Sequence, residues 1–232
     1  LVEQFQLILF QKVISKLPLE VINNLDLIAG TKEQKRLNNT FKLKQFGLVI
    51  HKNLMVKPFK INIPDKILKN IKKKVEKFPW HEMPNNGGWE YGANLDYMKN
   101  IAKYWVKDFD WKKHEVKINE FPNFLTKVED INIHFIHEKG SGINPTPLLL
   151  MHGWPGSIVE FLHIIKKLAH PEKFGGKEED AFDVIVPSLP GFGFSGKPSN
   201  PMGPRKMSKI FNKLMIKNLG YKNYLAQGGD WG

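Results

Sequence analysis

The stretch "NYLAQGGDWG", residues 223–232, decides how the C-terminal half of this sequence is interpreted. A short apolar run leads into "GGDWG" at residues 228–232, which has the form Gly-x-acid-x-Gly. In such a turn a strand bends sharply into a helix, and the central side chain projects from the strand's end. Asp230 would then be a carboxylate nucleophile that needs no base and forms an ester by displacement at saturated carbon. A solvated Asp in a glycine turn is the alternative for this pentapeptide taken alone.

A second glycine-containing loop, "HGWPGS" at residues 152–157, follows the apolar run "PLLLM". In a sheet of this type, the loop after that strand supplies one backbone N–H of an oxyanion hole, and the residue after the nucleophile supplies the other. Trp154 and Trp231 occupy these two positions, and Pro155 and Gly156 would make the turn rigid. The loop alone indicates only a tight turn, but the two motifs together, in this order, favour a catalytic site.

Strands alternate with helices across residues 121–232, the part of the sequence that contains both motifs. "FLTKVEDINIHFIHEKG" predicts a hairpin that turns at Glu129 and Asp130. "PLLLMHG" and the start of "FDVIVPSLPGFGFS" predict buried strands, and "NYLAQGGD" predicts a third strand. "IVEFLHIIKKLAH" and "MSKIFNKLMIKNLG" predict helices, the second ending at Gly220. Alternating strands and helices indicate an α/β fold with a doubly wound, mostly parallel sheet.

Residues 57–120 have a different pattern. Alternation over residues 57–63 predicts a short strand, and Pro64 and Asp65 begin an amphipathic helix with lysines on its polar face. Asn94 is expected to cap a further helix. The apolar stripe of that helix is expected to pack into the core, a ligand-binding stripe being the alternative; it consists of Tyr97, Ile101, Tyr104 and Trp105.

The first 56 residues show no pattern that predicts a chemistry. Leu1–Leu17 favours an amphipathic helix, because Glu3, Lys12 and Lys16 interrupt its apolar residues. A membrane-spanning helix needs about 20 apolar residues, and no uncharged run approaches that length. Any membrane association is therefore expected to be peripheral, through lysines and the apolar face of this helix.

Composition argues against several classes of partner and cofactor. The formal net charge is +12, but Arg36 and Arg205 are the only arginines, and arginine is the residue suited to bidentate phosphate and base contacts. We therefore predict a solvated lysine-rich surface and no nucleic-acid partner. The sequence has no cysteine, which excludes disulfides and thiolate metal sites. No other pattern indicates a metal or a cofactor, so none is predicted.

The runs "LLLMHGWPGSIVEF", "FDVIVPSLPGFGFS" and "YLAQGGDWG" resemble the epoxide hydrolase branch of the α/β-hydrolase superfamily. "PFKINIPDKIL" and "FPNFLTKVEDINIHFIHEKG" resemble the N-terminal segment of the microsomal type, which includes the insect juvenile-hormone epoxide hydrolases. The resemblance covers residues 57–232. It implies an epoxide-hydrolase N-terminal segment over residues 57–120 and the N-terminal half of an α/β-hydrolase core over residues 121–232, with residues 1–56 unassigned.

The resemblance also implies roles for particular residues. Asp230 would be the nucleophile, and the backbone N–H groups of Trp154 and Trp231 would form the oxyanion hole. His152 would shape its loop without acting as the catalytic base. The other loop-shaping residues would be Gly153, Pro155, Gly156, Gly228 and Gly232. The implied reaction opens a small apolar epoxide to a vicinal diol without a cofactor, in epoxide detoxification at the endoplasmic reticulum membrane.

In the family this sequence resembles, two lid tyrosines, a histidine base and its acid follow the nucleophile along the chain. The sequence stops two residues after Asp230. The resemblance therefore implies a fragment that does not turn over epoxides alone. A haloalkane dehalogenase relative is a second hypothesis, against which the long segment before residue 121 argues. A non-catalytic remnant is the third.

Overall fold

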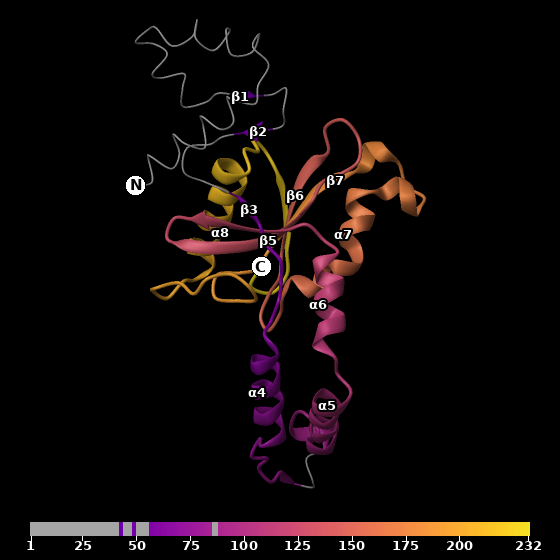
Figure 1. The fold of residues 1–232 in the computed structure, drawn as a ribbon, viewed down its shortest axis with the longest axis vertical. Helices are drawn as coiled ribbons and strands as arrows, with labels where there is room; N and C mark the ends of the chain where they lie inside the picture. Colours follow the sequence, from indigo (N-terminus) through magenta and orange to yellow (C-terminus); the bar gives the residue numbers. More distant parts are fainter. Residues whose placement is uncertain (1–41, 44–47, 50–55, 85–87) are drawn as a thin grey trace, which may run out of the picture. The chain divides into compact units, whose positions relative to one another are not determined.

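A computed structural model of the chain describes residues 42–43, 48–49, 56–84 and 88–232 (Figure 1). Two short strands near the N-terminus, β1 (Lys42–Leu43) and β2 (Leu48–Val49), pair in antiparallel orientation. The amphipathic helix expected at residues 1–17 lies outside the described residues. Residues 55–232 form one unit built around a single sheet.

That sheet has six strands in the order β3-β4-β5-β7-β6-β8. The strands are β3 (Lys57–Pro58), β4 (Asn123–Val128), β5 (Ile131–Glu138), β6 (Thr146–Met151), β7 (Phe182–Pro187) and β8 (Leu225–Gly228). β7, β6 and β8 are parallel, whereas β3, β4, β5 and β7 pair in antiparallel orientation. The hairpin β4–β5 turns at Glu129, as expected, with a positive φ of 56°.

Helices cover both faces of this sheet, so the predicted α/β fold is confirmed. α7 (Leu162–Ala169) connects β6 to β7, and α8 (Pro204–Lys213) connects β7 to β8 on the opposite face (Figure 1). Alternate residues of one strand face opposite sides: Leu148 and Leu150 pack on the α7 side, and Leu149 packs on the α8 side. Short helical turns complete the connections; they are η2 (Trp89–Tyr91), η3 (Ile158–Phe161), η4 (Pro171–Phe174), η5 (Glu178–Asp180) and the π-helix η6 (Leu214–Asn218).

The segment before the hairpin is helical. It contains α4 (Asp65–Glu76), α5 (Leu95–Lys107) and α6 (Trp111–Asn119), of which α6 was not predicted from the sequence. The expected cap of α5 is present, because the Asn94 side chain accepts a hydrogen bond from the Tyr97 N–H at 2.9 Å. Among the helices described, none is long and apolar enough to cross a membrane.

The strand predicted over residues 57–63 is wrong beyond Pro58. The Phe59 N–H still donates to the Asn123 carbonyl oxygen of β4, but side chains of α6 bind the backbone of Ile61 and Ile63. The Asn119 amide accepts from the Ile61 N–H at 2.9 Å and donates to its carbonyl at 2.8 Å. The Glu115 carboxylate accepts from the Ile63 N–H at 2.6 Å. The alternating pattern is nevertheless meaningful, since Ile61 is 1% exposed and packs in the core.

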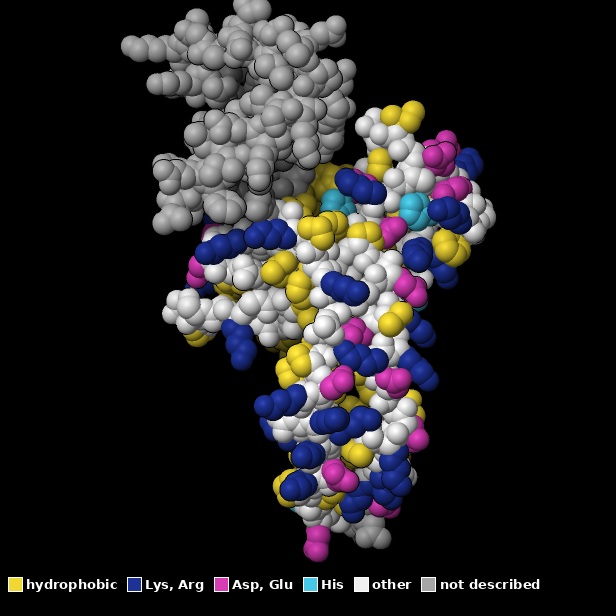
Figure 2. Space-filling model, viewed as in Figure 1, with side chains coloured by type: hydrophobic (Ala, Val, Ile, Leu, Met, Phe, Trp, Pro, Cys, Tyr) yellow, Lys and Arg dark blue, Asp and Glu magenta, His cyan; other side chains and the backbone are white. Residues whose placement is uncertain are grey.

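The expected core packing of the aromatic stripe on α5 is also wrong for the described residues. Tyr97, Ile101, Tyr104 and Trp105 are between 40% and 56% exposed. The last three line a groove of about 880 Å³ between α4 and α5, which Phe194 also lines. Hydrophobic and lysine side chains are interspersed over α4 and α5 (Figure 2).

Candidate active site

Sheet topology brings the two glycine motifs together although they are more than 70 residues apart. β6 and β8 are parallel neighbours, with Met151 opposite Gly228 at their carboxyl ends. The chain goes from β6 to β7 over one face and returns to β8 over the other. Sites in such sheets lie at the carboxyl ends of strands where the direction of winding reverses. The loops that follow β6 and β8 meet at this point.

The turn at Asp230 needs its glycines for steric reasons. Asp230 has a positive φ of 57°, which a residue with a side chain seldom adopts. A Cβ added to Gly228 would lie 2.3 Å from Gly232, and one added to Gly232 would lie 2.3 Å from the Met151 carbonyl oxygen. A Cβ on Gly153 would lie 2.5 Å from the Asp230 carboxylate. These three glycines therefore allow the strained turn to sit directly against the neighbouring loop.

Two backbone N–H groups converge on a single oxygen of the Asp230 carboxylate. The Trp154 N–H donates to Oδ1 at 2.8 Å, and the Trp231 N–H donates to the same atom at 2.7 Å. Hydrogen bonds from the described residues reach Asp230 only at Oδ1. Oδ2 is therefore left available to an incoming electrophile, and the two donors are aimed at its partner oxygen.

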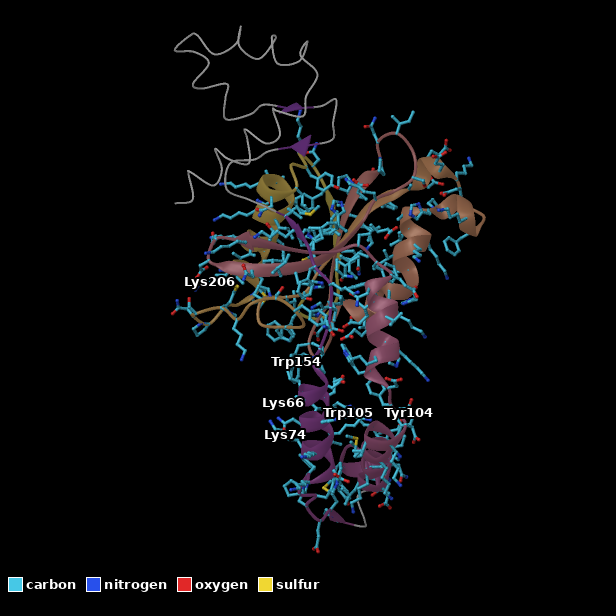
Figure 3. The ribbon with its side chains drawn as sticks, in the orientation of Figure 1. Lys66, Lys74, Tyr104, Trp105, Trp154 and Lys206 are labelled. Atoms are coloured by element: carbon cyan, nitrogen blue, oxygen red, sulfur yellow. The ribbon has the colours of Figure 1, made fainter. Side chains whose placement is uncertain are left out.

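The loop that carries Trp154 is held by its own short contacts. Ser157 caps η3: its hydroxyl accepts from the Val159 N–H at 3.3 Å, and its N–H donates to the Glu160 carboxylate at 3.1 Å. Gly156 lies against that carboxylate, with no room for a Cβ. The peptide bond before Pro155 is cis. The Trp154 side chain is 62% exposed and lies at the end of the sheet from which α4 extends (Figure 3).

His152 is buried beneath this loop, and both ring nitrogens are occupied. The Leu189 N–H donates to Nε2 at 3.1 Å, so Nε2 carries no proton. Nδ1 must then carry it and donate to the Gly153 carbonyl oxygen at 3.0 Å. A neutral ring with both nitrogens committed has no free lone pair with which to activate water. The arrangement suits a residue that shapes the loop.

The structure thus brings together all the site residues predicted from the sequence. Sequence reasoning missed two further contacts to His152, from Leu189 and from the Phe192 ring, whose centroid is 5.8 Å away. Both belong to "PSLPGFGFS", which the sequence marks as a Gly/Pro loop after a buried strand without indicating its target. The groove between α4 and α5 is lined by neither Asp230 nor its two amide donors.

Comparison with known proteins agrees with this geometry. Residues 56–161 match the family model described as "Epoxide hydrolase N terminus", and residues 146–232 match that of the alpha/beta hydrolase fold. Epoxide hydrolase 1 of Oryctolagus cuniculus is 41% identical over 183 residues, covering 76% of this chain and 40% of that protein. Juvenile hormone epoxide hydrolase 1 of Ctenocephalides felis is 37% identical over 185 residues, covering 78% of this chain and 39% of that protein.

Solved structures show the same similarity. Aspergillus niger epoxide hydrolase superposes with a TM-score of 0.68 at 31% identity, covering 77% of this chain and 47% of that one. The Bombyx mori juvenile hormone epoxide hydrolase gives 0.67 at 32% identity, with coverages of 78% and 43%. The chain spans about 40% of the length of the curated relatives it matches. Through residues 56–232, this chain belongs to the epoxide hydrolase family of α/β-fold hydrolases.

Proposed function

We propose that this chain carries the nucleophile and the oxyanion hole of an epoxide hydrolase that converts small apolar epoxides to vicinal diols. The observation that supports this most strongly is the convergence of the Trp154 and Trp231 N–H groups on Asp230 Oδ1. The relatives named as epoxide hydrolases support the choice of substrate. The family model matched by residues 56–161 favours an epoxide over a haloalkane.

The first step forms an ester on Asp230. An Oδ2 lone pair forms a bond to the less hindered ring carbon, and the bond from that carbon to the ring oxygen breaks. The electron pair stays on the ring oxygen, which takes up a proton. A carboxylate is a weak nucleophile. Fixing it beside the bound substrate compensates for this by making the attack effectively intramolecular.

The second step hydrolyses the ester, and here the two amides act. Water adds to the Asp230 carboxyl carbon, and negative charge develops on Oδ1, where both N–H groups already point. Removing one donor of this kind typically costs about 10²–10³-fold in rate. Collapse of the intermediate releases the diol and restores the carboxylate. The new diol oxygen therefore comes from Asp230, and the oxygen of water enters the carboxylate.

Isotope labelling tests this route. Protein in excess over styrene oxide is incubated in H₂¹⁸O, and hydroxylamine then releases any ester. The proposal predicts a released diol without ¹⁸O, because its second oxygen was that of Asp230. A diol that carries ¹⁸O would show direct attack of water on the ring. The Asp230→Ala variant measures the background of solvent hydration.

We further propose that any membrane association is peripheral and involves the lysine-rich surface of α4 and α5. The exposed apolar residues between these lysines support the proposal, since this combination favours binding in the interfacial plane of a membrane.

A further inference from the structure

A buried histidine lies beneath the loop of residues 188–196. His134, on β5, is fully buried. Its Nδ1 lies 3.0 Å from the Ser188 hydroxyl, and its Nε2 lies 3.0 Å from Asn123 Oδ1. Buried polar groups need hydrogen-bond partners, and here both ring nitrogens have one. Nothing in the proposed reaction uses this histidine directly.

The surrounding groups determine where its proton lies. The Asn123 side-chain N–H groups donate to two backbone carbonyls, those of Ile118 at 2.9 Å and Phe121 at 2.8 Å. Asn123 Oδ1 is therefore the atom that faces His134, and it accepts from Nε2. Nδ1 then accepts from the Ser188 hydroxyl. Burial lowers the pKa of His134 to about 4, which keeps the ring neutral and Nδ1 free to accept.

β5 holds both ends of the 188–196 loop. The Ser188 N–H donates to the His134 carbonyl oxygen at 2.9 Å, and the Gly196 N–H donates to that of Asn132 at 2.7 Å. The Ser195 hydroxyl accepts from the His134 N–H at 3.0 Å and donates to the Ser188 carbonyl oxygen at 2.8 Å. The Phe194 ring packs edge-on against the imidazole, with centroids 5.1 Å apart. His134 is the central anchor of these contacts.

The other side of the loop touches the active site. One residue after Ser188, the Leu189 N–H fixes His152 Nε2, and the Phe192 ring packs against the same imidazole. His152 binds the Gly153 carbonyl oxygen, and the following N–H, that of Trp154, binds the nucleophile. Each of these links is a direct hydrogen bond or a covalent neighbour, so a displacement at Ser188 is transmitted to Trp154.

We propose that His134 is a positioning residue: through Ser188 and the 188–196 loop it fixes His152, and thereby the Trp154 N–H that binds Asp230. The effect of His134 on catalysis rests on the function proposed above. Active-site groups must be held within about 0.5 Å of their productive positions, and a shift of about 1 Å costs roughly 10²-fold in rate. A hydrogen-bonded anchor beneath the loop provides that precision without touching the substrate.

The test uses Ser188→Ala, which removes the hydroxyl that donates a hydrogen bond to His134 Nδ1 and leaves the ring in place. A change at His134 itself would also remove the hydrogen bond to Asn123. Thr126→Val is the matched control, because Thr126 is 3% exposed and its hydroxyl accepts from Asn218, away from the 188–196 loop. Two quantities are measured: hydrogen exchange of the Trp154 amide, and the rate of ester formation from styrene oxide. The exchange of the Trp154 amide is easier to assign because the next residue, Pro155, has no N–H to exchange.

We expect Trp154 exchange to rise about tenfold in Ser188→Ala and to stay near the wild-type value in Thr126→Val. The maximal rate of ester formation should fall about tenfold, with the half-saturating epoxide concentration unchanged within about twofold. Unchanged exchange in Ser188→Ala, or an equal rise in both variants, would overturn the inference. A selective rise in exchange, combined with no ester on Asp230 in the wild type, would support the positioning role and reject the proposed function.

Discussion

At the scale of single residues, Gly153 offers the sharpest test of the site's geometry. A Cβ there would lie 2.5 Å from Asp230 Oδ1, so Gly153→Ala must displace either the Asp230 carboxylate or the loop that carries Trp154. We predict that Gly153→Ala slows ester formation from styrene oxide by about 10²-fold or more. The rate is measured by intact-protein mass spectrometry.

Gly229→Ala is the matched control for this prediction. Gly229 lies in the same turn, but a Cβ there would meet nothing within 4 Å. Ester formation in this variant should stay within about threefold of the wild type. Equal rates in the two variants would show that the Gly153 contact does not position the carboxylate.

Two histidines, the buried His134 and the partly buried His137, predict how stability depends on pH. Burial lowers the pKa of His134 to about 4, and burial together with the nearby Lys139 does the same for His137. In the unfolded chain both return towards 6.5, so between pH 6.5 and pH 4 the unfolded state binds more protons. Stability should therefore fall as pH decreases through this window. From pH 7 to pH 5 the loss is about 2 kcal/mol per histidine.

Urea unfolding at pH 7 and pH 5 measures this loss. His134→Gln should remove about half of the decrease in the free energy of unfolding between pH 7 and pH 5, whatever the substitution costs at pH 7. His81→Gln, at an exposed position, should leave the difference unchanged. A difference that His134→Gln does not reduce would contradict the assignment of a neutral buried ring.

At the scale of elements, α6 shows what the sequence could not reveal. Residues 59–63 carry the alternating pattern of a strand, yet β3 ends at Pro58. The backbone N–H groups of Ile61 and Ile63 bind the side chains of Asn119 and Glu115, more than 50 residues away along the chain. Periodicity reports which side of a segment is buried, as at Ile61, but not which group binds its backbone.

Glu115→Gln should weaken the contact between this segment and α6. Burial alone would raise the pKa of Glu115, but hydrogen bonds from the Ile63 N–H, Lys112 and Trp111 outweigh it and hold the pKa below its ordinary value. Glutamine keeps one acceptor oxygen, so its NH₂ group would face either Lys112 or the N–H groups of Ile63 and Trp111. We predict a loss of about 1.5–3 kcal/mol in the free energy of unfolding, measured in urea. The exposed Glu120→Gln should cost less than about 0.5 kcal/mol, and equal costs would contradict the anchoring role.

The surface of α4 and α5 gives a prediction about membranes. Trp105 and Ile67 are exposed, and Figure 3 shows Lys66 and Lys74 of α4 in the same region as Trp105 of α5. Vesicles rich in phosphatidylserine should therefore bind the protein and release it at high salt. Trp105→Glu should weaken cosedimentation with the vesicles. Val116→Glu, on α6 and 63% exposed in the wild type, should not. Equal binding to neutral phosphatidylcholine vesicles, or retention after a carbonate wash, would contradict peripheral electrostatic binding.

At the scale of the molecule, the sequence predicted the parts of the site that depend on local pattern. Apolar runs identified β6 and β8, and the parallel arrangement then implied that the loops after them meet. The aromatic stripe of α5 was misjudged because a helical apolar face looks the same whether or not another element covers it. The contact of His134 with Ser188 joins residues 54 positions apart, and no local signal marks it. Such contacts follow from tertiary packing alone.

Every step of the proposed reaction depends on Asp230 acting as the nucleophile. The most direct measurement is incubation of the protein with styrene oxide, followed by proteolysis and mass spectrometric mapping of the adduct. We predict one adduct per chain, located on Asp230, labile to hydroxylamine and absent from Asp230→Ala. An adduct of equal yield in Asp230→Ala, or one confined to lysine or histidine side chains, would contradict the assignment of Asp230 as the nucleophile.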